Sequence, residues 1–380
     1  MESNNDVYRK LQRHIDSMPI PFPESKSGLD IKLLKHFFSP EEAEIAIELS
    51  ALPEPINRIH KRLKGTSISL KELEITLNKM VEKGSILGGK FFESKGKGKL
   101  YSKAPLAIGM YELQVGRLTK ELENDFQGYL HETFYKVAHS KKTSQMRTIP
   151  ISKSINTDRY LDSYDNVKKI VENTDKPIAV FKCVCREGKD LLEEPCKHSD
   201  IRETCLIFED IAIASIHKGN AREITKEETL SILDKAEKAG FVLQPENNQK
   251  PNFICCCCGD CCNVLTTIKK FPRPVEYYHS NFYSKVNSEK CDLCWDCIEK
   301  CPMDALSMED DSPLVDLDRC IGCGVCVSTC KSGAYELKSK GIKHVPPKNT
   351  DAMYKKIFLE RIGFGGMIKN LPKIIFHQKI

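Results

Sequence analysis

Residues 291–302 read Cys-Asp-Leu-Cys-Trp-Asp-Cys-Ile-Glu-Lys-Cys-Pro, and residues 320–330 read Cys-Ile-Gly-Cys-Gly-Val-Cys-Val-Ser-Thr-Cys. Each stretch places three cysteines at intervals of three residues and a fourth cysteine four residues later. A tight loop with this spacing brings three thiolates to three irons of one cubane cluster, whereas zinc needs four ligands in separated pairs. Because the pattern occurs twice, the sequence predicts two 4Fe–4S clusters and a fold built around them.

The doubled motif resembles that of bacterial dicluster ferredoxins, in which the fourth cysteine of each motif binds the other cluster. The resemblance implies one cluster on Cys291, Cys294, Cys297 and Cys330 and a second on Cys320, Cys323, Cys326 and Cys301. Gly322 and Gly324 suit a loop whose amides point at inorganic sulfide, where side chains would crowd. Trp295 could shield the first cluster from water or simply pack, and packing is the favoured interpretation.

Ten of the 18 cysteines lie outside the doubled motif, and none of the 18 precedes Cys183 or follows Cys330. Clustered thiols in a reducing compartment usually bind metal rather than form disulfides. The further candidate ligands are Cys183, Cys185, Cys196, Cys205, Cys255, Cys257, Cys258, Cys261 and Cys262. The first four can complete one cubane and the others permit another cluster, so we expect at least one additional iron–sulfur cluster.

The local pattern of these cysteines leaves alternatives open. Residues two apart in an extended strand share a face, so Cys183 and Cys185 could grip one centre, and Cys255 with Cys257 could face it. Neighbours such as Cys257-Cys258 and Cys261-Cys262 point apart, and would serve different irons or leave one thiol free. Zinc is the alternative metal. His198 could replace a thiolate, although an ordinary surface histidine is the favoured interpretation.

The whole chain is predicted to be α+β, with six segments. They are an N-terminal helical segment (1–38), a winged-helix-like domain (39–105), a helical connector (106–176), a cysteine-rich iron–sulfur domain (177–270), a dicluster 4Fe–4S ferredoxin domain (271–340) and a basic amphipathic C-terminal tail (341–380). Capping boxes at Ser39–Glu42 and Ser69–Glu72 start two of the three helices that precede a hairpin. Apolar residues at steps of three or four predict an amphipathic helix within 106–147.

Charge and hydropathy exclude some classes of protein. The net charge of +5 is too mild to indicate a nucleic-acid binder, and no apolar run reaches the roughly 18–20 residues of a membrane span. The hairpin tip is basic, but the third helix mixes lysine with glutamate, so a solvated or protein-docking surface is favoured over DNA. Residues 351–380 could lie at a membrane surface, dock on a partner or pack on their own domain. We expect a cytoplasmic protein, with attachment to the inner face of the membrane as an alternative.

Motifs along nearly the whole chain resemble those of 4Fe–4S-binding proteins of anaerobic bacteria and archaea. They are Tyr8–Leu11, Ser39–Glu44, Cys183–Arg186, Glu203–Leu206, the Cys255–Cys262 run, His279–Tyr283 and the doubled cysteine motif. Such relatives often carry a cysteine at the position of Asp260 and a different residue at that of Cys256, which is therefore left out of the candidate ligands. The resemblance implies electron transfer and names no substrate.

The favoured function is an electron-transfer protein or redox-complex subunit that relays single electrons between partner proteins. One alternative is a redox enzyme subunit whose extra centre binds a substrate such as a disulfide. Another is a redox-sensing regulator that binds DNA through the winged helix. No nucleotide fingerprint, flavin signature or Ser–His–Asp arrangement is visible, and no catalytic residue is assigned.

Overall fold

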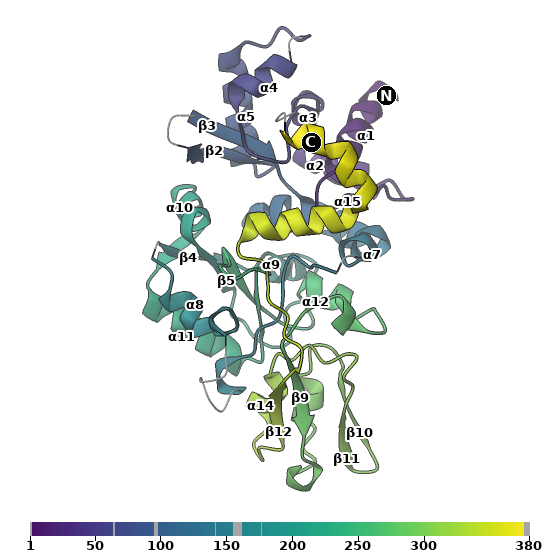
Figure 1. Cartoon of the computed structure of the whole chain (residues 1–380), viewed down its shortest axis with the longest axis vertical. Coiled ribbons are helices and arrows are strands. Elements are labelled where there is room, and N and C mark those ends of the chain that lie inside the picture. Colours follow the sequence, from purple (N-terminus) through teal and green to yellow (C-terminus); the bar gives the residue numbers. More distant parts are fainter. Residues whose placement is uncertain are drawn as a thin grey trace. The chain divides into compact units, whose positions relative to one another are not determined.

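The computed structural model of the chain describes residues 2–63, 65–94, 98–140, 142–154, 162–175 and 177–375. Helices are mixed with antiparallel sheets, which agrees with the α+β prediction. The contacts divide the chain into two compact units, residues 1–138 with 357–380 and residues 139–356. Figure 1 labels the elements of both units.

The first unit begins with helices and continues into a three-stranded sheet of order β1-β3-β2. Its helices are α1 (Glu2–Asp16), α2 (Leu29–Phe37), α3 (Pro40–Ile47), α4 (Ile56–Arg62), α5 (Leu70–Glu82), α6 (Lys120–Tyr129) and α7 (Tyr135–Ala138), and its strands are β1 (Glu54–Pro55), β2 (Ile86–Ser94) and β3 (Gly98–Lys103). Ser39 and Ser69 form the two predicted capping boxes with Glu42 and Glu72. The tip of the hairpin, residues 95–97, lies outside the described residues.

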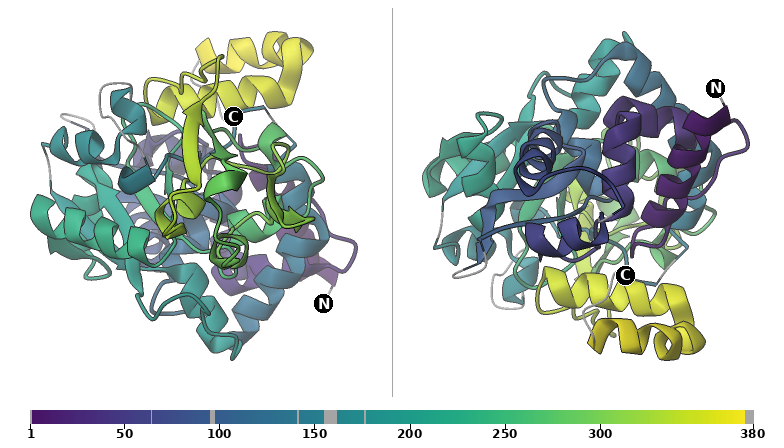
Figure 2. Two further views of the ribbon diagram at one scale, coloured as in Figure 1. Left: turned by 90° about the horizontal axis from the view of Figure 1, so that it is seen from below. Right: turned by 90° about the horizontal axis from the view of Figure 1, so that it is seen from above.

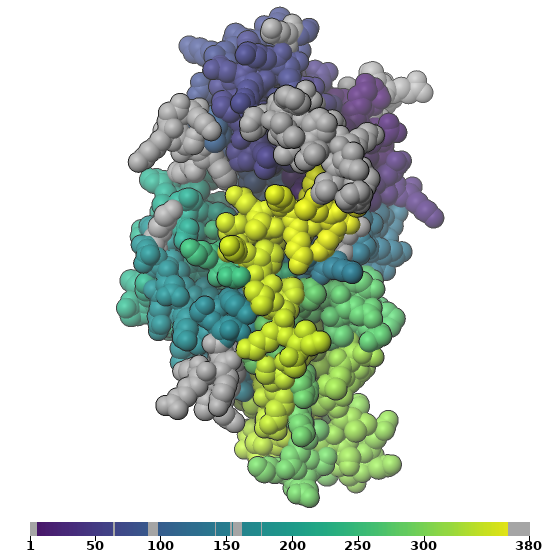
Figure 3. All heavy atoms as spheres, in the orientation of Figure 1, coloured from purple at the N-terminus to yellow at the C-terminus, as the bar shows by residue number. Residues whose placement is uncertain are grey.

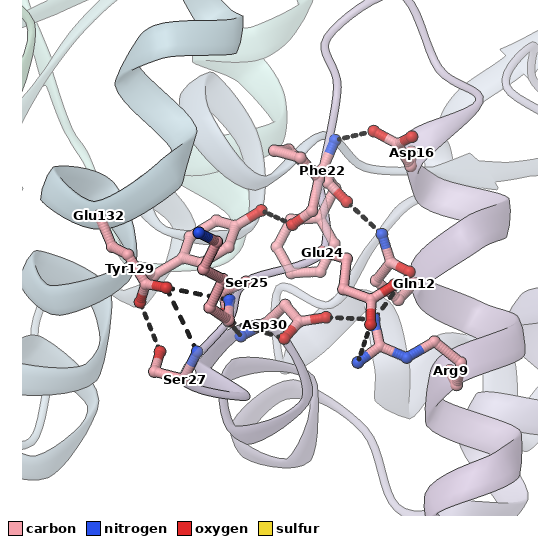
Figure 4. Close-up of polar contacts among 12 residues, drawn as sticks. Arg9, Gln12, Asp16, Phe22, Glu24, Ser25, Ser27, Asp30, Tyr129 and Glu132 are labelled. Atoms are coloured by element: carbon pink, nitrogen blue, oxygen red, sulfur yellow. Dashed lines mark hydrogen bonds and ion pairs between the residues drawn. The ribbon is translucent and has the colours of Figure 1, made fainter.

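Side chains rather than regular structure hold the proline-rich stretch between α1 and α2 (Figure 4). The buried carboxylate of Asp30 accepts hydrogen bonds from Arg9 Nη1 at 2.6 Å and from Ser25 Oγ at 2.9 Å. The Gln12 amide donates to the Phe22 carbonyl at 2.6 Å, and the Tyr129 hydroxyl donates to the Pro23 carbonyl at 2.7 Å. A stretch whose prolines cannot donate backbone hydrogen bonds is thereby fixed by its neighbours.

Only part of the predicted helical connector (106–176) is helical. A π-helical turn (Leu130–Phe134) joins α6 to α7, and the helix ends at Ala138. Beyond it the Ile149 amide donates to the Leu243 carbonyl at 3.1 Å, so the chain runs extended beside β7 (Val242–Pro245). Pairing with a strand edge satisfies the backbone groups that a helix would have satisfied internally, which explains the difference from the prediction.

The second unit contains a five-stranded antiparallel sheet and two smaller two-stranded sheets. The large sheet has the order β6-β4-β5-β8-β7, and the small ones pair β9 with β12 and β10 with β11. The remaining bounds are β4 (Ile178–Lys182), β5 (Glu203–Phe208), β6 (Arg222–Ile224), β8 (Phe253–Cys257), β9 (Phe282–Val286), β10 (Leu306–Glu309), β11 (Ser312–Val315), β12 (Tyr335–Ser339), α8 (Val167–Glu172), α9 (Val184–Leu191), α10 (Glu209–His217), α11 (Lys226–Lys238), α12 (Asn263–Ile268), α13 (Asp296–Glu299) and α14 (Val325–Thr329). Both small sheets lie at the lower end of this unit in Figure 1, the end that faces the viewer in the left view of Figure 2.

The core of the second unit lies between the large sheet and its helices. Leu206 and Ile254 from β5 and β8 are fully buried and belong to the same apolar cluster as Leu233 of α11 and Val171 of α8. Thr225 caps α11 by accepting from the Glu228 amide. This core holds the strands that carry the cysteines at fixed register.

Residues 341–349 cross the surface of the second unit as an extended segment, in yellow in Figure 3. The His344 amide donates to Asn281 Oδ1 at 2.7 Å, and the Gln249 amide donates to the Pro347 carbonyl at 2.8 Å. The segment leads into α15 (Thr350–Ile375), which is broken at Gly363, where φ is +63°. The tail is thus bound to its own chain at least as far as α15.

Early residues of α15 also pack on the chain. Met353 and Ile357 are buried, and Arg361 Nη2 lies 3.3 Å from Asp16 Oδ1. Of the alternatives for the tail, packing on its own chain therefore holds up to Arg361. Among the described helices, none combines the length and the hydropathy that crossing a bilayer requires.

Candidate metal centres

The two cysteine motifs of the ferredoxin segment share one backbone shape. The first motif (Cys291–Cys301) contains α13 and the second motif (Cys320–Cys330) contains α14. Leu293 and Trp295 have φ of +57° and +67°, and Gly322 and Gly324, at the equivalent positions, have φ of +63° and +81°. A left-handed conformation costs a non-glycine residue about 1–2 kcal/mol, so the first motif adopts this loop without the residue type that favours it.

The glycines of the second motif are required by close packing. A Cβ atom on Gly322 would lie 2.1 Å from the Phe282 carbonyl oxygen, and one on Gly324 would lie 2.4 Å from Ser154 Oγ. The sequence interpretation assigned these glycines to crowding around the cluster. The structure adds a different cause, because the crowding atoms belong to β9 and to the stretch before residue 155.

The four cysteines assigned to the second cluster line a single cavity, together with Ser284, Met303 and Gly322. The cysteines are Cys301, Cys320, Cys323 and Cys326. The Ala305 amide donates to Cys301 Sγ at 3.3 Å, and the Ser284 amide donates to Cys320 Sγ at 3.4 Å. Amide hydrogen bonds to the ligand sulfurs are a feature of 4Fe–4S sites, and a cavity ringed by four thiols fits a cubane.

Three of the cysteines assigned to the first cluster pack in an apolar cluster that also contains Cys301 and Cys326 of the second. Cys291, Cys297 and Cys330 pack there with Tyr335, and the Ala334 amide donates to Cys330 Sγ at 3.3 Å. Cys294 is exposed. Burial raises the pKa of the Cys297 thiol, and a metal ion that displaces the proton removes this penalty.

The environments of the two motifs differ. Trp295 is 55% exposed and Leu293 is 39% exposed, whereas Ile321 of the second motif is 2% exposed. The interpretation of Trp295 as a packed residue is therefore wrong. The second motif contacts the rest of the unit directly, since the Ile151 amide donates to the Cys323 carbonyl at 3.1 Å.

Of the ten remaining cysteines, six come together in one group. This six-thiol group consists of Cys183, Cys185, Cys205, Cys255, Cys257 and Cys262. Strand register makes the first contact, because Cys205 of β5 lies opposite Cys255 of β8 and their sulfurs are 3.8 Å apart. Cys257 contacts Cys255 and Cys262, and Cys185 contacts Cys262 and Cys183.

The electrostatics of the six-thiol group favour the thiolate form of Cys183. The hydrogen bond from Cys185, opposed by burial and aided by nearby Arg186, lowers the pKa of the Cys183 thiol to about 7. Amide side chains also point at the sulfurs: Gln244 Nε2 lies 3.5 Å from Cys262 Sγ, and Asn263 Nδ2 lies 3.5 Å from Cys185 Sγ. These donors stabilise negative charge on sulfur, as metal-bound thiolates require.

A second group contains Cys196, Cys258 and Cys261 together with Asp260, and is called the Cys196 group below. The ligand atoms of these four residues all lie within 4.8 Å of one another. The sequence interpretation grouped Cys196 with Cys183, Cys185 and Cys205, but the structure does not bring these four thiols together. The reason is local: Cys205 is held in β5, whereas Cys196 lies on the loop between α9 and β5 and faces the other side of the Cys255–Cys262 run.

Sequence reasoning missed two residues of this region. Asp260 stands between Cys258 and Cys261, and a carboxylate within a cysteine run could have marked it as a ligand. Arg186 is completely buried, with Nη2 3.4 Å from Cys258 Sγ and its guanidinium 4.1 Å from the centre of the Phe241 ring. His198 lies beside Asp260, 3.7 Å from Oδ1, rather than among the thiols. Cys256 is buried in the apolar core and belongs to neither group.

The cysteine-rich part approaches the ferredoxin segment closely. A Cβ atom on Gly259 would lie 2.7 Å from Pro302 Cα, so the turn within the Cys255–Cys262 run abuts the residue after Cys301. Cys301 lines the cavity of the second cluster. The second cluster site is therefore next to the run that supplies both other groups.

Comparison with known proteins identifies the segment that carries the doubled motif. Residues 290–334 match the family model of the 4Fe-4S dicluster domain. The chain is 33% identical to an uncharacterized ferredoxin of Methanocaldococcus jannaschii, over 14% of this chain and 57% of the relative. A second uncharacterized ferredoxin of that organism is 32% identical, over 24% of this chain and 55% of the relative. The match therefore spans little more than half of each of these relatives.

A short stretch of the chain also matches a larger protein. The chain is 38% identical to the indolepyruvate oxidoreductase subunit IorA of Methanothermobacter thermautotrophicus, over 15% of this chain and 9% of that subunit. These matches confirm the predicted C-terminal dicluster ferredoxin domain with 4Fe–4S clusters. The chain is an iron–sulfur protein whose dicluster domain is of the kind found in ferredoxins and in a redox enzyme subunit.

Proposed function

We propose that the protein is an electron carrier, or the electron-carrying subunit of a redox complex, whose path runs from the first motif through the second to a further iron–sulfur centre on the six-thiol group. A 4Fe–4S cluster exchanges one electron at a time when bound. The observation that carries the proposal is the contact of Gly259 with Pro302, which brings the cysteine-rich part against the second cluster site.

The six-thiol group suits an iron–sulfur centre better than zinc. The six thiols are linked by pairwise contacts, and one zinc ion or one cubane would bind four of them. Soft thiolate ligands in a buried setting favour iron–sulfur clusters, and Gln244 and Asn263 supply the hydrogen bonds that tune a cluster potential. We assign no separate role to Cys256, which faces the core.

The first motif supplies the docking surface for a redox partner in this proposal. Leu293, Cys294 and Trp295 are exposed, although two of them are large apolar residues. An exposed aromatic residue is a frequent anchor of protein interfaces. Trp295 would thus cover the first cluster in the free protein and contact the partner in the complex. An anaerobic cytoplasm is the compartment that suits so exposed a cluster.

Iron analysis of anaerobically purified full-length protein tests the proposal. The two clusters of the dicluster domain account for about eight irons, and one further cubane raises the count to about twelve. Cys257→Ser should lose the additional irons, whereas Cys256→Ala, a change at the adjacent cysteine, should retain them. A count of about eight irons in protein kept free of oxygen would contradict the extra centre. Failure of a low-potential donor to reduce the protein rapidly would contradict electron transfer.

We also propose that residues 39–105 form a winged-helix domain that docks on protein rather than DNA. The order α3, β1, α4, α5, β2, β3 with strand order β1-β3-β2 supports this fold. Lys99 Nζ lies 2.6 Å from Glu74 Oε1, and Lys83 is paired with Glu42, so part of the basic charge is neutralised within the domain. A gel shift with random duplex DNA checks the proposal, and salt-sensitive binding that changes on oxidation would favour the regulator instead.

A further inference from the structure

We propose that the Cys196 group is a separate site for a single divalent, thiophilic metal ion, zinc or ferrous iron, with Asp260 as its fourth ligand. The site is distinct from the six-thiol group and from the two cluster sites of the dicluster domain. It extends the proposed function without depending on it, because its metal content is measured independently of electron transfer.

The spacing of the ligand atoms fits one ion. Four ligands placed tetrahedrally at about 2.3 Å from a zinc ion lie about 3.8 Å from one another. Cys196 Sγ lies 3.6 Å from Cys258 Sγ and 3.9 Å from Asp260 Oδ1, and all four ligand atoms lie within 4.8 Å of one another. The set therefore has the dimensions of a single tetrahedral site.

The dicluster domain provides a comparison within the same chain. In a cubane each thiolate binds a different iron, so its ligand sulfurs stand apart around the cluster. Cys301, Cys320, Cys323 and Cys326 do this, since they line a cavity. Cys196 and Cys258 are in direct contact, as Cys205 and Cys255 of the six-thiol group also are. The feature that distinguishes the Cys196 group is therefore its carboxylate, because 4Fe–4S clusters are held by four cysteine thiolates.

The chain builds this site from two segments. Cys258 and Cys261 flank the turn that follows β8, and Cys196 comes from the loop after α9. The Lys197 amide donates to Asp260 Oδ2 at 2.9 Å, which leaves Oδ1 facing the thiols. The neighbour of one ligand thus orients another, the usual role of hydrogen bonds around a metal site.

Burial points to a closed site. Cys258 and Cys261 are each 2% exposed and Cys196 is 9% exposed, while the Asp260 side chain is 23% exposed. Four protein ligands with three of them shielded from water are typical of structural metal sites, in which no position is left for a substrate. The ion would hold the turn at Gly259, which abuts Pro302, and so fix the approach to the second cluster site.

Charge also favours a bound cation. Three thiolates and one carboxylate carry four negative charges, of which a divalent ion neutralises two. Arg186 supplies one further positive charge, which it shares with Cys183 of the six-thiol group, because its Nη2 lies 3.4 Å from Cys258 Sγ in a completely buried position. Its Nε has no hydrogen-bond partner among the described residues. A buried guanidinium held in this way needs stable negative charge beside it, and metal-bound thiolates provide it.

Metal analysis of the full-length protein, purified without oxygen, tests the site. Cys258→Ser should lose about one metal ion per chain, either zinc or a single iron seen by Mössbauer spectroscopy as a high-spin ferrous doublet, and should keep the cluster irons. Cys256→Ala, at the neighbouring cysteine that faces the core, should lose neither. A loss of about four irons from Cys258→Ser would assign these thiols to a cluster and overturn the proposal. An unchanged metal content would overturn it too.

A second variant keeps the test decisive if Cys258→Ser fails to fold. X-ray absorption at the zinc edge of zinc-grown protein should show three sulfur ligands and one oxygen, and Asp260→Cys should convert this to four sulfurs without changing the zinc content. The iron–sulfur clusters do not contribute at this edge. A sulfur count that is the same in both proteins, or the absence of zinc from both proteins together with no high-spin ferrous doublet, would rule out Asp260 as a ligand to a single ion.

Discussion

The first motif of the dicluster domain faces solvent, and the second faces the rest of its own unit. Both loops use the same left-handed backbone positions, but the first places Leu293 and Trp295 there and the second places Gly322 and Gly324. Only in the second do another strand and a serine side chain occupy the space that a Cβ atom would need. Packing around the second motif therefore explains its glycines, because the first motif forms the same loop without glycine.

In the proposed function the two motifs have different tasks. The first contacts a partner protein, and the second contacts the rest of the chain. The second motif is tied to the rest of the unit through Ile151, and Pro302, which follows the first motif, lies against Gly259. The first motif leaves Leu293, Cys294 and Trp295 exposed, as the proposed docking surface requires. Substitutions at equivalent positions of the two motifs should consequently differ in effect.

The largest difference is expected at the first left-handed position. Gly322→Ala should lower the free energy of unfolding by roughly 2–4 kcal/mol and release about four irons, because the new Cβ would overlap the Phe282 carbonyl. Leu293→Gly, the matched change in the first motif, should retain all the iron. Urea unfolding and iron analysis of both variants check this. Equal losses in the two variants would mean that glycine is needed by the cluster rather than by packing.

Acid should loosen the side of the domain next to the second motif. Burial and nearby His279 lower the pKa of His344 to about 4, and the His344 amide bonds to Asn281, which precedes Phe282. From pH 6.5 down to 4 the unfolded chain binds a proton that the folded chain does not. The free energy of unfolding should therefore decrease as the pH is lowered through this window, by roughly 2 kcal/mol in all.

His344→Gln should flatten that dependence. Urea unfolding of the wild type and the variant at pH 7 and pH 5 measures it. A slope that persists unchanged in the variant would assign the acid sensitivity to other groups, including the cluster ligands.

A smaller effect on stability is expected from loss of an exposed ligand. Cys294→Ser should damage the first cluster and lower the iron content by up to about four atoms, while residues 1–138 keep their fold. Circular dichroism with limited proteolysis measures the fold of that unit. Its unfolding in this variant would show that the two units depend on one another.

Trp295→Ala should have the smallest effect on folding, within about 0.5 kcal/mol, because the side chain is 55% exposed. The iron content should stay constant, but electron exchange with a partner protein should slow several-fold if the indole is part of the docking surface. Stopped-flow reduction compares the variant with the wild type. An unchanged rate with a protein donor would move the docking site elsewhere.

The spacing of Cys291–Cys301 and Cys320–Cys330 predicts the dicluster domain because a local loop determines which thiolates meet. The same reasoning fails for the other ten cysteines. Whether Cys205 meets Cys255 depends on the register of β5 against β8, and the position of Cys196 depends on a loop between distant elements. Neither follows from periodicity. Pairing with β7 likewise overrides the helical pattern before Ile149.

Capping boxes were predictable at Ser39 and Ser69 because their hydrogen bonds span three residues. Asp260 and Arg186 were not identified, since each acquires its meaning only when the chain brings sulfur atoms to it. Alternation within the Cys255–Cys262 run was the one useful local signal for these residues. It separates Cys257 from Cys258 and Cys261 from Cys262, as the two groups require.

That division has a consequence for how the gene can change. The pairs Cys257-Cys258 and Cys261-Cys262 each send one thiol to the six-thiol group and the other to the Cys196 group. Inserting or deleting one codon between Cys255 and Cys257, within β8, would turn Cys257 to the opposite side of the strand, away from the six-thiol group. Cys256 belongs to neither group and can be replaced without the loss of a ligand, whereas the length of the run cannot change. Homologues that bind both centres should therefore differ at positions such as Cys256, but not in the number of residues between Cys255 and Cys262.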